Sequence, residues 1–498
     1  MNNLKRLHIA AIFVLFLTAL RSFLLPFILS FFLGSSNDQV GFFRFEYIWI
    51  GILLFIFFQG IGHWLTFKYR IVAGELYIQR GIFVKKKRYI QQQKVQSIDI
   101  SAGLFQRLFG LVKLKVETAG GGAEPEVNFS AISREEAENI RAQLLRKNEF
   151  IHSAFDLEKG VAIERIDEKV NYSWFLSKGH LLIAALTSSG IGLTISAVAA
   201  LFSQVEQFLP ESIYEQLFGI FAESGMALFL SLIAIVIFLS WCISFLGTLL
   251  KYGGFKIEKQ GEELVISRGL MEQRQLTIHT HRVTAIRVVR NVFRQPFGFA
   301  TIYVESAGGG TNDEQLSTVL IPLTRMKDIK VIFEQILPNY ALEYPIQSVP
   351  KRALIRFLIR NTIIPLVATV LIGWLVNPLG YYGFFVVAIC LIFGYLKYCD
   401  SGAGFDHSRV WLRYRKVSQI MVISERKKIQ AVEIKTSFFQ KRRALTSFRF
   451  SILSSVVGKS FMVLELDKDH AKSLLKWFSS SKNKERNKKA DRYSECRE

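Results

Sequence analysis

The sequence predicts an α+β membrane protein in which three pairs of transmembrane helices each precede a small antiparallel β domain. The first observation is an internal repeat: residues 76–122 recur without a gap at an offset of 188, so that Gly110 corresponds to Gly298. The second is a set of paired apolar runs, and the third is period-two alternation of apolar and polar residues between them. Because repeats fix an architecture, we expect one unit of two spans and one module, used three times.

The composition supports spans separated by charged domains. Half of the 498 residues are hydrophobic and the mean hydropathy is +0.26, yet 21% of the residues are charged. The net charge of +22 favours a polyanionic neighbour. Since the chain is also predicted to span a membrane, we expect anionic lipid and no nucleic acid. The four cysteines match neither a disulfide framework nor a zinc site.

Six apolar runs approach or exceed the ~20 helical residues that cross a bilayer. They cover residues 9–33, 45–66, 181–202, 226–250, 357–376 and 380–396. No small-residue cleavage site follows the first run, so we predict an uncleaved span and not a signal peptide. Arg21 lies inside that run as an intramembrane charge, which costs about 2.5–3.5 kcal/mol at the bilayer centre. It either pairs within the bundle or extends from a shorter span to the interface.

The Lys and Arg distribution predicts the orientation. Lys5 precedes the first span, Lys68 follows the second and Lys397 follows the sixth, whereas segment 203–225 carries four Glu and no Lys or Arg. Positive loops stay in the cytoplasm, and Arg44 is the one dissenting charge. We therefore predict a multi-pass protein of the cell membrane, with both termini and all three modules cytoplasmic.

The modules are predicted to be antiparallel sheets closed by a helix. Residues 112–118 alternate apolar and polar side chains, as a half-buried strand does. Ser133 and Glu136 form a capping box before an apolar face at helical spacing, and 323–337 and 469–478 occupy the same place in the other copies. Gly110 and Gly298 are predicted to be structural, in equivalent turns that need a positive φ. The predicted boundaries are transmembrane pair 1–67, module 68–147, linker 148–180, transmembrane pair 181–253, module 254–338, linker 339–352, transmembrane pair 353–397, module 398–478 and a basic disordered tail 479–498.

Three stretches carry a family resemblance. Residues 88–98, 104–111 and 116–121 resemble the signature of the bacterial pleckstrin-homology-like (PH-like) domain in YdbS/YdbT-type membrane proteins, and the three copies with paired spans resemble the YdbT type. The resemblance implies a PH-like β-barrel or sandwich with a capping helix, no known enzymatic activity, and a smaller companion membrane protein with one such domain. The third copy departs from the pattern: Ala444 replaces the Gly of Phe-Gly, and 454–458 replaces the Gly triplet.

Chemical motifs are weak. His279 and His281 alternate on one strand without a third metal ligand nearby, and Gly458-Lys459-Ser460 lacks the Gly that a phosphate loop needs five positions earlier. We predict no catalytic, cofactor-binding or metal-binding residue, and no cofactor.

Basic clusters are the candidate binding residues. They are Lys85, Lys86, Lys87, Arg88, Arg413, Arg415, Lys416, Arg426, Lys427, Lys428, Lys441, Arg442 and Arg443. As solvated faces that obey the positive-inside rule they need no ligand. The alternative is contact with anionic headgroups, where each Lys or Arg contributes about 1 kcal/mol.

Three functions are compatible with this organisation. The first is a non-enzymatic membrane scaffold whose modules bind anionic headgroups or partner proteins, with a role in envelope stress or resistance to membrane-active peptides. The alternative is a transporter or channel subunit that acts with a smaller companion, although the spans look like tethers and not like inverted repeats with broken helices. The third, an enzyme on lipid or peptidoglycan intermediates, needs a carboxylate or His constellation that the sequence does not reveal.

Overall fold

A computed structural model describes most of the chain. The described residues are 4–34, 39–72, 74–81, 84–118, 126–145, 170–188, 196, 211–306, 317–340, 346–375, 382–454 and 458–479. The chain divides into two compact units, Met1–Ile278 and His279–Glu498, which we describe separately. Both Gly triplets and the predicted tail beyond residue 479 lie outside the described residues.

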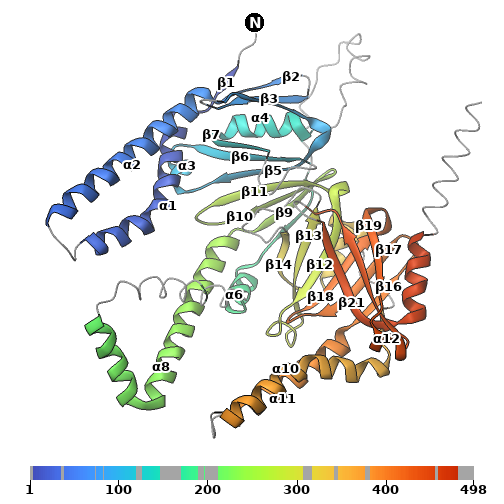
Figure 1. Cartoon of the computed structure of the whole chain (residues 1–498). Helices are drawn as coiled ribbons and strands as arrows, with labels where there is room; N and C mark the ends of the chain where they lie inside the picture. Colours follow the sequence, from blue (N-terminus) through green and yellow to red (C-terminus); the bar gives the residue numbers. More distant parts are fainter. Residues whose placement is uncertain are drawn as a thin grey trace, which may run out of the picture. The chain divides into compact units, whose positions relative to one another are not determined.

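Helices lie in the predicted apolar runs (Figure 1), although most of the run 181–202 lies outside the described residues. Their bounds are Ala11–Gly34 for α1, Gln39–Thr66 for α2, Lys178–Leu186 for α6, Glu211–Tyr252 for α8, Leu354–Leu375 for α10 and Gly383–Asp400 for α11. Among the described residues, four segments are long and apolar enough to cross a membrane: Trp49–Thr66, Ile233–Tyr252, Lys351–Leu375 and Gly383–Asp400. In α1 the apolar stretch among described side chains is Ala11–Leu20, and the side chain of Arg21 lies outside that description.

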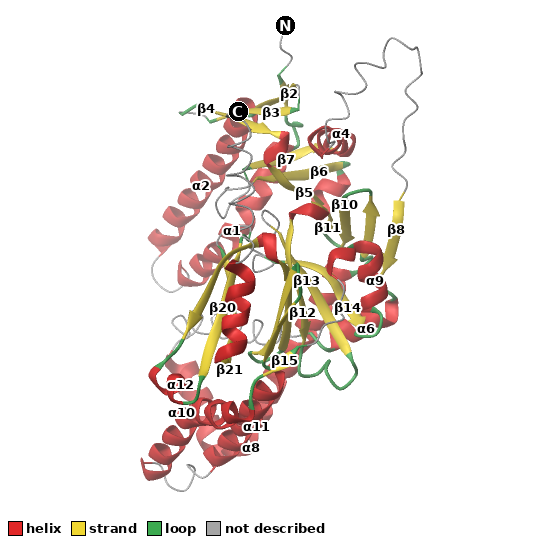
Figure 2. Ribbon diagram, turned by 90° about the vertical axis from the view of Figure 1, so that its right-hand side faces the viewer, coloured by secondary structure: helices red, strands yellow, loops and turns green. Residues whose placement is uncertain are grey.

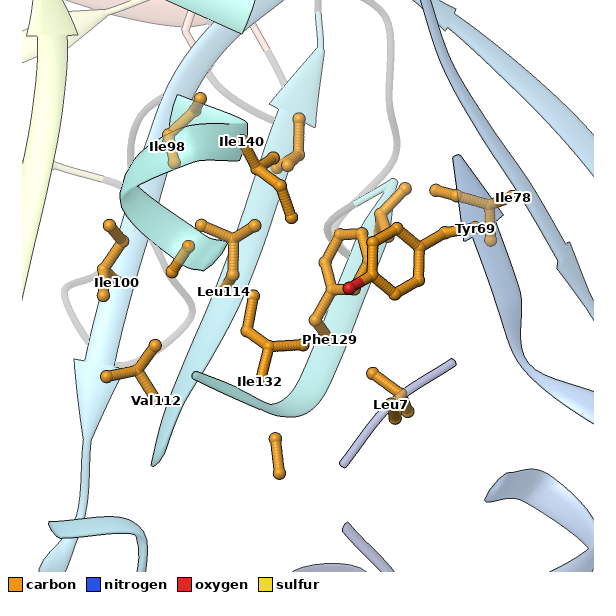
Figure 3. Packing of buried hydrophobic residues seen from close by; sticks show 14 of the residues in the cluster. Leu7, Tyr69, Ile78, Ile98, Ile100, Val112, Leu114, Phe129, Ile132 and Ile140 are labelled. Carbon is orange, nitrogen blue, oxygen red and sulfur yellow. The ribbon is translucent and has the colours of Figure 1, made fainter. Parts of the chain in front are cut away.

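The first module is a sandwich of two antiparallel sheets. Its strands are β1 (Lys5–Arg6), β2 (Lys68–Val72), β3 (Glu75–Arg80) and β4 (Lys86–Gln91) in one sheet, and β5 (Val95–Ala102), β6 (Leu111–Thr118) and β7 (Val127–Ser133) in the other. Tyr69 from the first sheet packs against Phe129 from the second, with ring centroids 5.0 Å apart. Figure 3 shows this core, in which Ile140 of α4 (Arg134–Leu145) covers Leu114 and its neighbours. The predicted cap is present, since Ser133 Oγ accepts a 3.2 Å hydrogen bond from the Glu136 amide.

Adjacent modules share their sheets. In the first unit β5–β7 continue into the strands of the second module to make one seven-stranded sheet; in the second unit the same happens between modules two and three. The added strands are β8 (Val170–Phe175), β9 (Lys256–Gln260), β10 (Glu263–Arg268), β11 (Gln273–His279), β12 (Val283–Arg290), β13 (Phe299–Ser306), β14 (Thr318–Arg325), β15 (Gln347–Ser348), β16 (Gly402–Phe405), β17 (Arg409–Arg415) and β18 (Gln419–Glu425).

The two shared sheets have the same register at their junctions. Ala102 of β5 pairs with Gln273 of β11. Arg290 of β12, 188 residues after Ala102, pairs with Gln419 of β18, 146 residues after Gln273. Each module thus lends its fifth strand to the fourth strand of the next module, so the repeat includes the junction as well as the module.

A strand on each side of the membrane segments was not expected from the sequence. β1 pairs with β2, β8 with β9 and β15 with β16. The strand before each pair of helices therefore pairs with the strand that follows the same pair of helices. β1 falls in the predicted transmembrane region, and β8 and β15 fall in the predicted linkers. β1 and β15 have two residues each, too few for periodicity to show.

Each module ends with a helix, as predicted, but the predicted bounds of the second helix are wrong. The second predicted helix, 323–337, begins too early: β14 extends to Arg325 and the helix α9 covers Ile329–Ile336. The third module ends in a sheet of β19 (Ile429–Lys435), β20 (Leu445–Ile452) and β21 (Lys459–Asp467), followed by a helix over residues 468–479. Its core includes Leu412 of β17 and Val422 of β18, together with Phe448 of β20 and Leu474 of the last helix. Figure 2 shows β20 beside its partner strand β21.

Candidate lipid-facing surface

The first predicted cluster lies at the start of strand β4. Lys85, Lys86 and Lys87 are exposed, and β4 pairs only with β3, so its other edge has no strand among the described residues. Lys87 pairs with Gln79 on β3, and Gln79 pairs with Lys68 on β2, two residues after α2 ends. Neighbouring strands are about 4.8 Å apart, which places Lys87 roughly 10 Å from the strand that leaves the membrane helix.

Arg88 differs from the three lysines before it. Its guanidinium forms an ion pair with the Glu126 carboxylate and donates a 3.1 Å hydrogen bond to the Glu126 carbonyl. The cluster therefore presents three exposed ammonium groups and one engaged guanidinium.

In the cluster at 413–416, most side chains bind other residues of the fold. Arg415 is buried and forms an ion pair with Asp400, the last residue of α11. Arg413 donates to the Asp400 carbonyl over 3.2 Å. Both side chains thus bind the end of a membrane helix, and Lys416 is the exposed member of this cluster.

The cluster at 426–428 is divided in the same way. Arg426 packs over the Trp477 ring at 4.9 Å and donates to the carbonyls of Trp477 and Phe478, where the last helix ends. Lys428 donates to the His281 carbonyl, and burial lowers the pKa of its ammonium group. Lys427 has a side chain that is 80% exposed.

The fourth cluster lies at the end of a short helix, α12 (Phe438–Arg442). Lys441, Arg442 and Arg443 are all exposed, and Arg442 lies 4.7 Å from the centre of the Phe438 ring. Arg443 donates to the Arg352 carbonyl, just before α10. This cluster therefore lies beside the start of a membrane helix.

The strand equivalent to β4 is covered in the second module. Arg274 of β11, at the position of Lys86, makes two hydrogen bonds of 2.9 and 2.7 Å to Asp99 of β5. Burial opposes charge on the Arg274 guanidinium, but Asp99 more than offsets this and raises its pKa. The position that is exposed on β4 in the first module is therefore used on β11 to bind the second module to the first.

Two buried glutamates at equivalent positions have different surroundings. Burial raises the pKa of Glu117 to about 7, even though Ser97 donates a 2.6 Å hydrogen bond to it, and nearby Asp99 raises the pKa further. Glu305, 188 residues later, is fully buried and forms ion pairs with Arg287 and Lys459. This pairing could not be predicted from the sequence, because Lys459 is 154 residues from Glu305.

The residues of the weak metal and phosphate motifs lie in or beside strands and contact other residues of the fold. The rings of His279 and His281 are 5.1 Å apart, and the described residues contain no group of three His, Cys, Asp or Glu side chains arranged for a metal ion. Lys459 of the Gly-Lys-Ser sequence binds Glu305 and Ser317. The positions of both motifs are thus explained by strand packing.

Comparison with known proteins decides the family. The bacterial PH domain family matches residues 10–148, 200–340 and 353–482. The chain belongs to the bacterial PH domain family. It is 35% identical over 492 residues to the UPF0699 transmembrane protein YdbT of Bacillus subtilis (strain 168), a match that covers 97% of this chain and 99% of that protein. The resemblance to the YdbT type is confirmed, and with it a membrane protein built from three PH-like repeats.

Proposed function

We propose that this protein is a non-enzymatic membrane scaffold whose first PH-like module binds anionic lipid headgroups through Lys85, Lys86 and Lys87. The observation that carries the proposal is the position of these lysines: they are exposed on an open sheet edge, two strands away from the end of α2. Like charges on one edge suit a diffuse anionic surface, where each ammonium contributes about 1 kcal/mol. A shaped pocket is not required.

The other basic clusters contribute less in this proposal. Arg413 and Arg415 are engaged at the end of α11, so they hold the third module to its span, whereas Arg426 is engaged at the end of that module's closing helix. The two arginines at α11 fix that module above the bilayer, and the exposed lysines of the first module then meet the headgroups.

A lysine footprint on the full chain tests the proposal. The protein is placed in nanodiscs of neutral or of anionic lipid, and acylation of each lysine is measured by mass spectrometry. We expect anionic lipid to lower acylation of Lys85, Lys86 and Lys87, and 1 M salt to restore it, because the Debye length falls from about 10 Å at 0.1 M to about 3 Å. Lys94 is the matched control, because it is exposed just past the opposite end of β4.

Equal acylation in both lipids would exclude headgroup binding by this edge. The edge would then be left for a protein partner. For that case we propose a companion membrane protein with one PH-like domain, and cross-linking from Lys86→Cys in native membrane followed by mass spectrometry would identify it or exclude it.

The cytoplasmic orientation is part of the proposal. A Cys at Ser212, in the acidic segment predicted outside, should react with an impermeant thiol reagent in intact cells, and one at Lys427 should not. The reverse pattern would place the modules outside. A role in envelope stress rests on the same acidic segment, and loss of the gene should then lower resistance to cationic membrane-active peptides.

A further inference from the structure

The loop that follows the fifth strand of each module has its apolar side chains on the outside. In loop 1 these are Leu104, Phe105, Leu108 and Phe109; in loop 2, Val292, Phe293 and Phe297; in loop 3, Phe438 and Phe439. All are exposed, Leu108 to 79% and Phe293 to 72%. Phe105, Phe293 and Phe439 occupy one repeat position, at offsets of 188 and 146.

The polar residue next to this position is turned inward. Gln440 is 5% exposed, bonds to Ser447 over 2.9 Å and completes a capping box with Ser437, while Phe439 beside it is 65% exposed. In loop 2 Arg294 is 7% exposed and bonds to Thr301 and to the Pro322 carbonyl, beside exposed Phe293. A loop in water would reverse this arrangement, because burying a phenyl ring is favourable and burying a polar group is costly.

Loop 1 is bonded to the end of a membrane helix. Arg107 donates a 2.9 Å hydrogen bond to the Leu270 carbonyl, and the Leu270 amide donates to Leu250 in the last turns of α8. Leu270 and Met271 are themselves exposed, to 54% and 45%. The apolar surface of loop 1 is therefore continuous with that of a span.

Loops 2 and 3 are likewise bonded to residues beside membrane helices, in both cases helices of the third pair. Gln295 of loop 2 accepts a 2.7 Å hydrogen bond from Arg415, which is ion-paired with Asp400 at the end of α11. In loop 3 the carbonyl of Ala444, the residue after Arg443, accepts a hydrogen bond from Arg352, two residues before α10 begins at Leu354. Each loop is thus linked by hydrogen bonds to residues at one end of a membrane helix.

We infer that these three loops insert into the boundary between headgroups and acyl chains of the bilayer, as apolar contacts additional to the spans. Aromatic side chains favour this boundary, and the exposed cations beside them, Arg107 and Lys441 to Arg443, suit its anionic headgroups. Insertion holds each module at a fixed height and orientation on its spans. The inference does not depend on headgroup binding by β4, since it concerns other residues and uncharged parts of the lipid.

Site-directed fluorescence on the full chain tests the inference. The four native cysteines, Cys242, Cys390, Cys399 and Cys496, are replaced by Ser, and a single Cys carrying a bimane label is placed at Phe105, Phe293 or Phe439. Leu453 is the matched control: it is 41% exposed and follows β20 at the end away from loop 3, about 27 Å along the strand. The labelled protein is reconstituted in nanodiscs of neutral phosphatidylcholine.

We expect a nitroxide attached to the lipid acyl chain to quench the loop labels several-fold more than the label at Leu453, and aqueous iodide to do the opposite. Loop labels that iodide reaches as well as it reaches Leu453 would overturn the inference. Labels shielded from both quenchers would overturn it too, because protein and not lipid would then cover the loops. Neutral lipid suffices here, whereas the lysine footprint requires anionic lipid, so the two proposals fail independently.

Discussion

The two seven-stranded sheets join their modules in the same register but with opposite charges at the same position. Asp99 on β5 corresponds to Arg287 on β12, 188 residues later. Asp99 binds Arg274 across the junction, whereas Arg287 binds Glu305 within its own sheet, and Glu305 is bound in turn by Lys459 of the third module. The comparison shows that backbone pairing and apolar packing set the junction, while its charges can be inverted if their partners change.

The largest effect should come from breaking the buried pair at the first junction. Asp99→Ala removes the carboxylate that binds the largely buried Arg274 guanidinium, and we expect a loss of about 3–5 kcal/mol in the stability of the first unit. Thermal unfolding of the full chain in detergent measures this as a lower midpoint for that unit. The double variant Asp99→Leu/Arg274→Met should recover most of the loss, because an apolar pair replaces both charges.

A surface pair supplies the control for this variant. Lys472 and Asp469 form an ion pair with exposed side chains, so Asp469→Ala should change stability by no more than about 1 kcal/mol. A junction loss no larger than this surface loss would show that the Asp99–Arg274 pair does not hold the modules together.

A smaller effect should appear in the pH dependence of the first unit, through Glu117. The pKa of Glu117 is raised from 4.5 to about 7 in the folded protein, so its protonated form stabilises the fold below about 4.5 and this contribution is lost as the pH rises through about 7. The difference amounts to at most about 3 kcal/mol. Glu117→Gln should make the midpoint of the first unit less dependent on pH between 5 and 8.

Glu305→Gln should not act in this way. Glu305 is bound by Arg287 and Lys459, so the amide removes two ion pairs and should destabilise the second unit at neutral pH. An unchanged midpoint for Glu305→Gln at neutral pH would contradict a stabilising role of these two ion pairs.

The sequence predicted the local elements well and the sharing of sheets not at all. The repeat, the apolar runs and the period-two strands each depend on residues near one another in the chain, which is where sequence patterns are informative. The junction depends on the pairing of β5 with β11, whose paired residues are about 175 positions apart. The residue pattern of neither strand indicates which strand it pairs with. The exposure of β4 could not be predicted for the same reason. β4 and β11 are equivalent strands of the repeat, and only β11 has a strand of another module beside it.

Predictions about the candidate site divide along the same line. Exposed lysines at 85–87 follow from composition, but Arg415 and Arg426 resemble them in sequence and are engaged at helix ends. Loops 1 to 3 contain Phe residues of the repeat, and hydrophobicity alone would place such residues in a core. The structure shows that these rings are exposed, while Gln440 and Arg294 beside them are buried.

The smallest expected effect concerns one backbone position in the three modules. Gly110 and Gly298 have φ of 64° and 69°, and Ala444, at the same repeat position, keeps a φ of 49°. A Cβ on Gly110 or Gly298 would meet nothing within 4 Å, so any cost of a side chain there comes from the backbone. The left-handed conformation costs an L-residue roughly 1–2 kcal/mol, partly offset by about 0.4–1 kcal/mol because Ala has less freedom than Gly when unfolded.

Ala444→Gly should therefore stabilise the second unit by about 1 kcal/mol or less, and Gly298→Ala should destabilise it by a similar amount, the difference of those two terms. Gly110→Val should cost the first unit more than Ala does, since a β-branched residue is strongly disfavoured at positive φ. Midpoints of thermal unfolding for the full-length variants measure all three. If Ala444→Gly lowers the midpoint while Gly298→Ala leaves it unchanged, the third module has adapted to alanine, and equivalence of the three turns would not extend to their energetics.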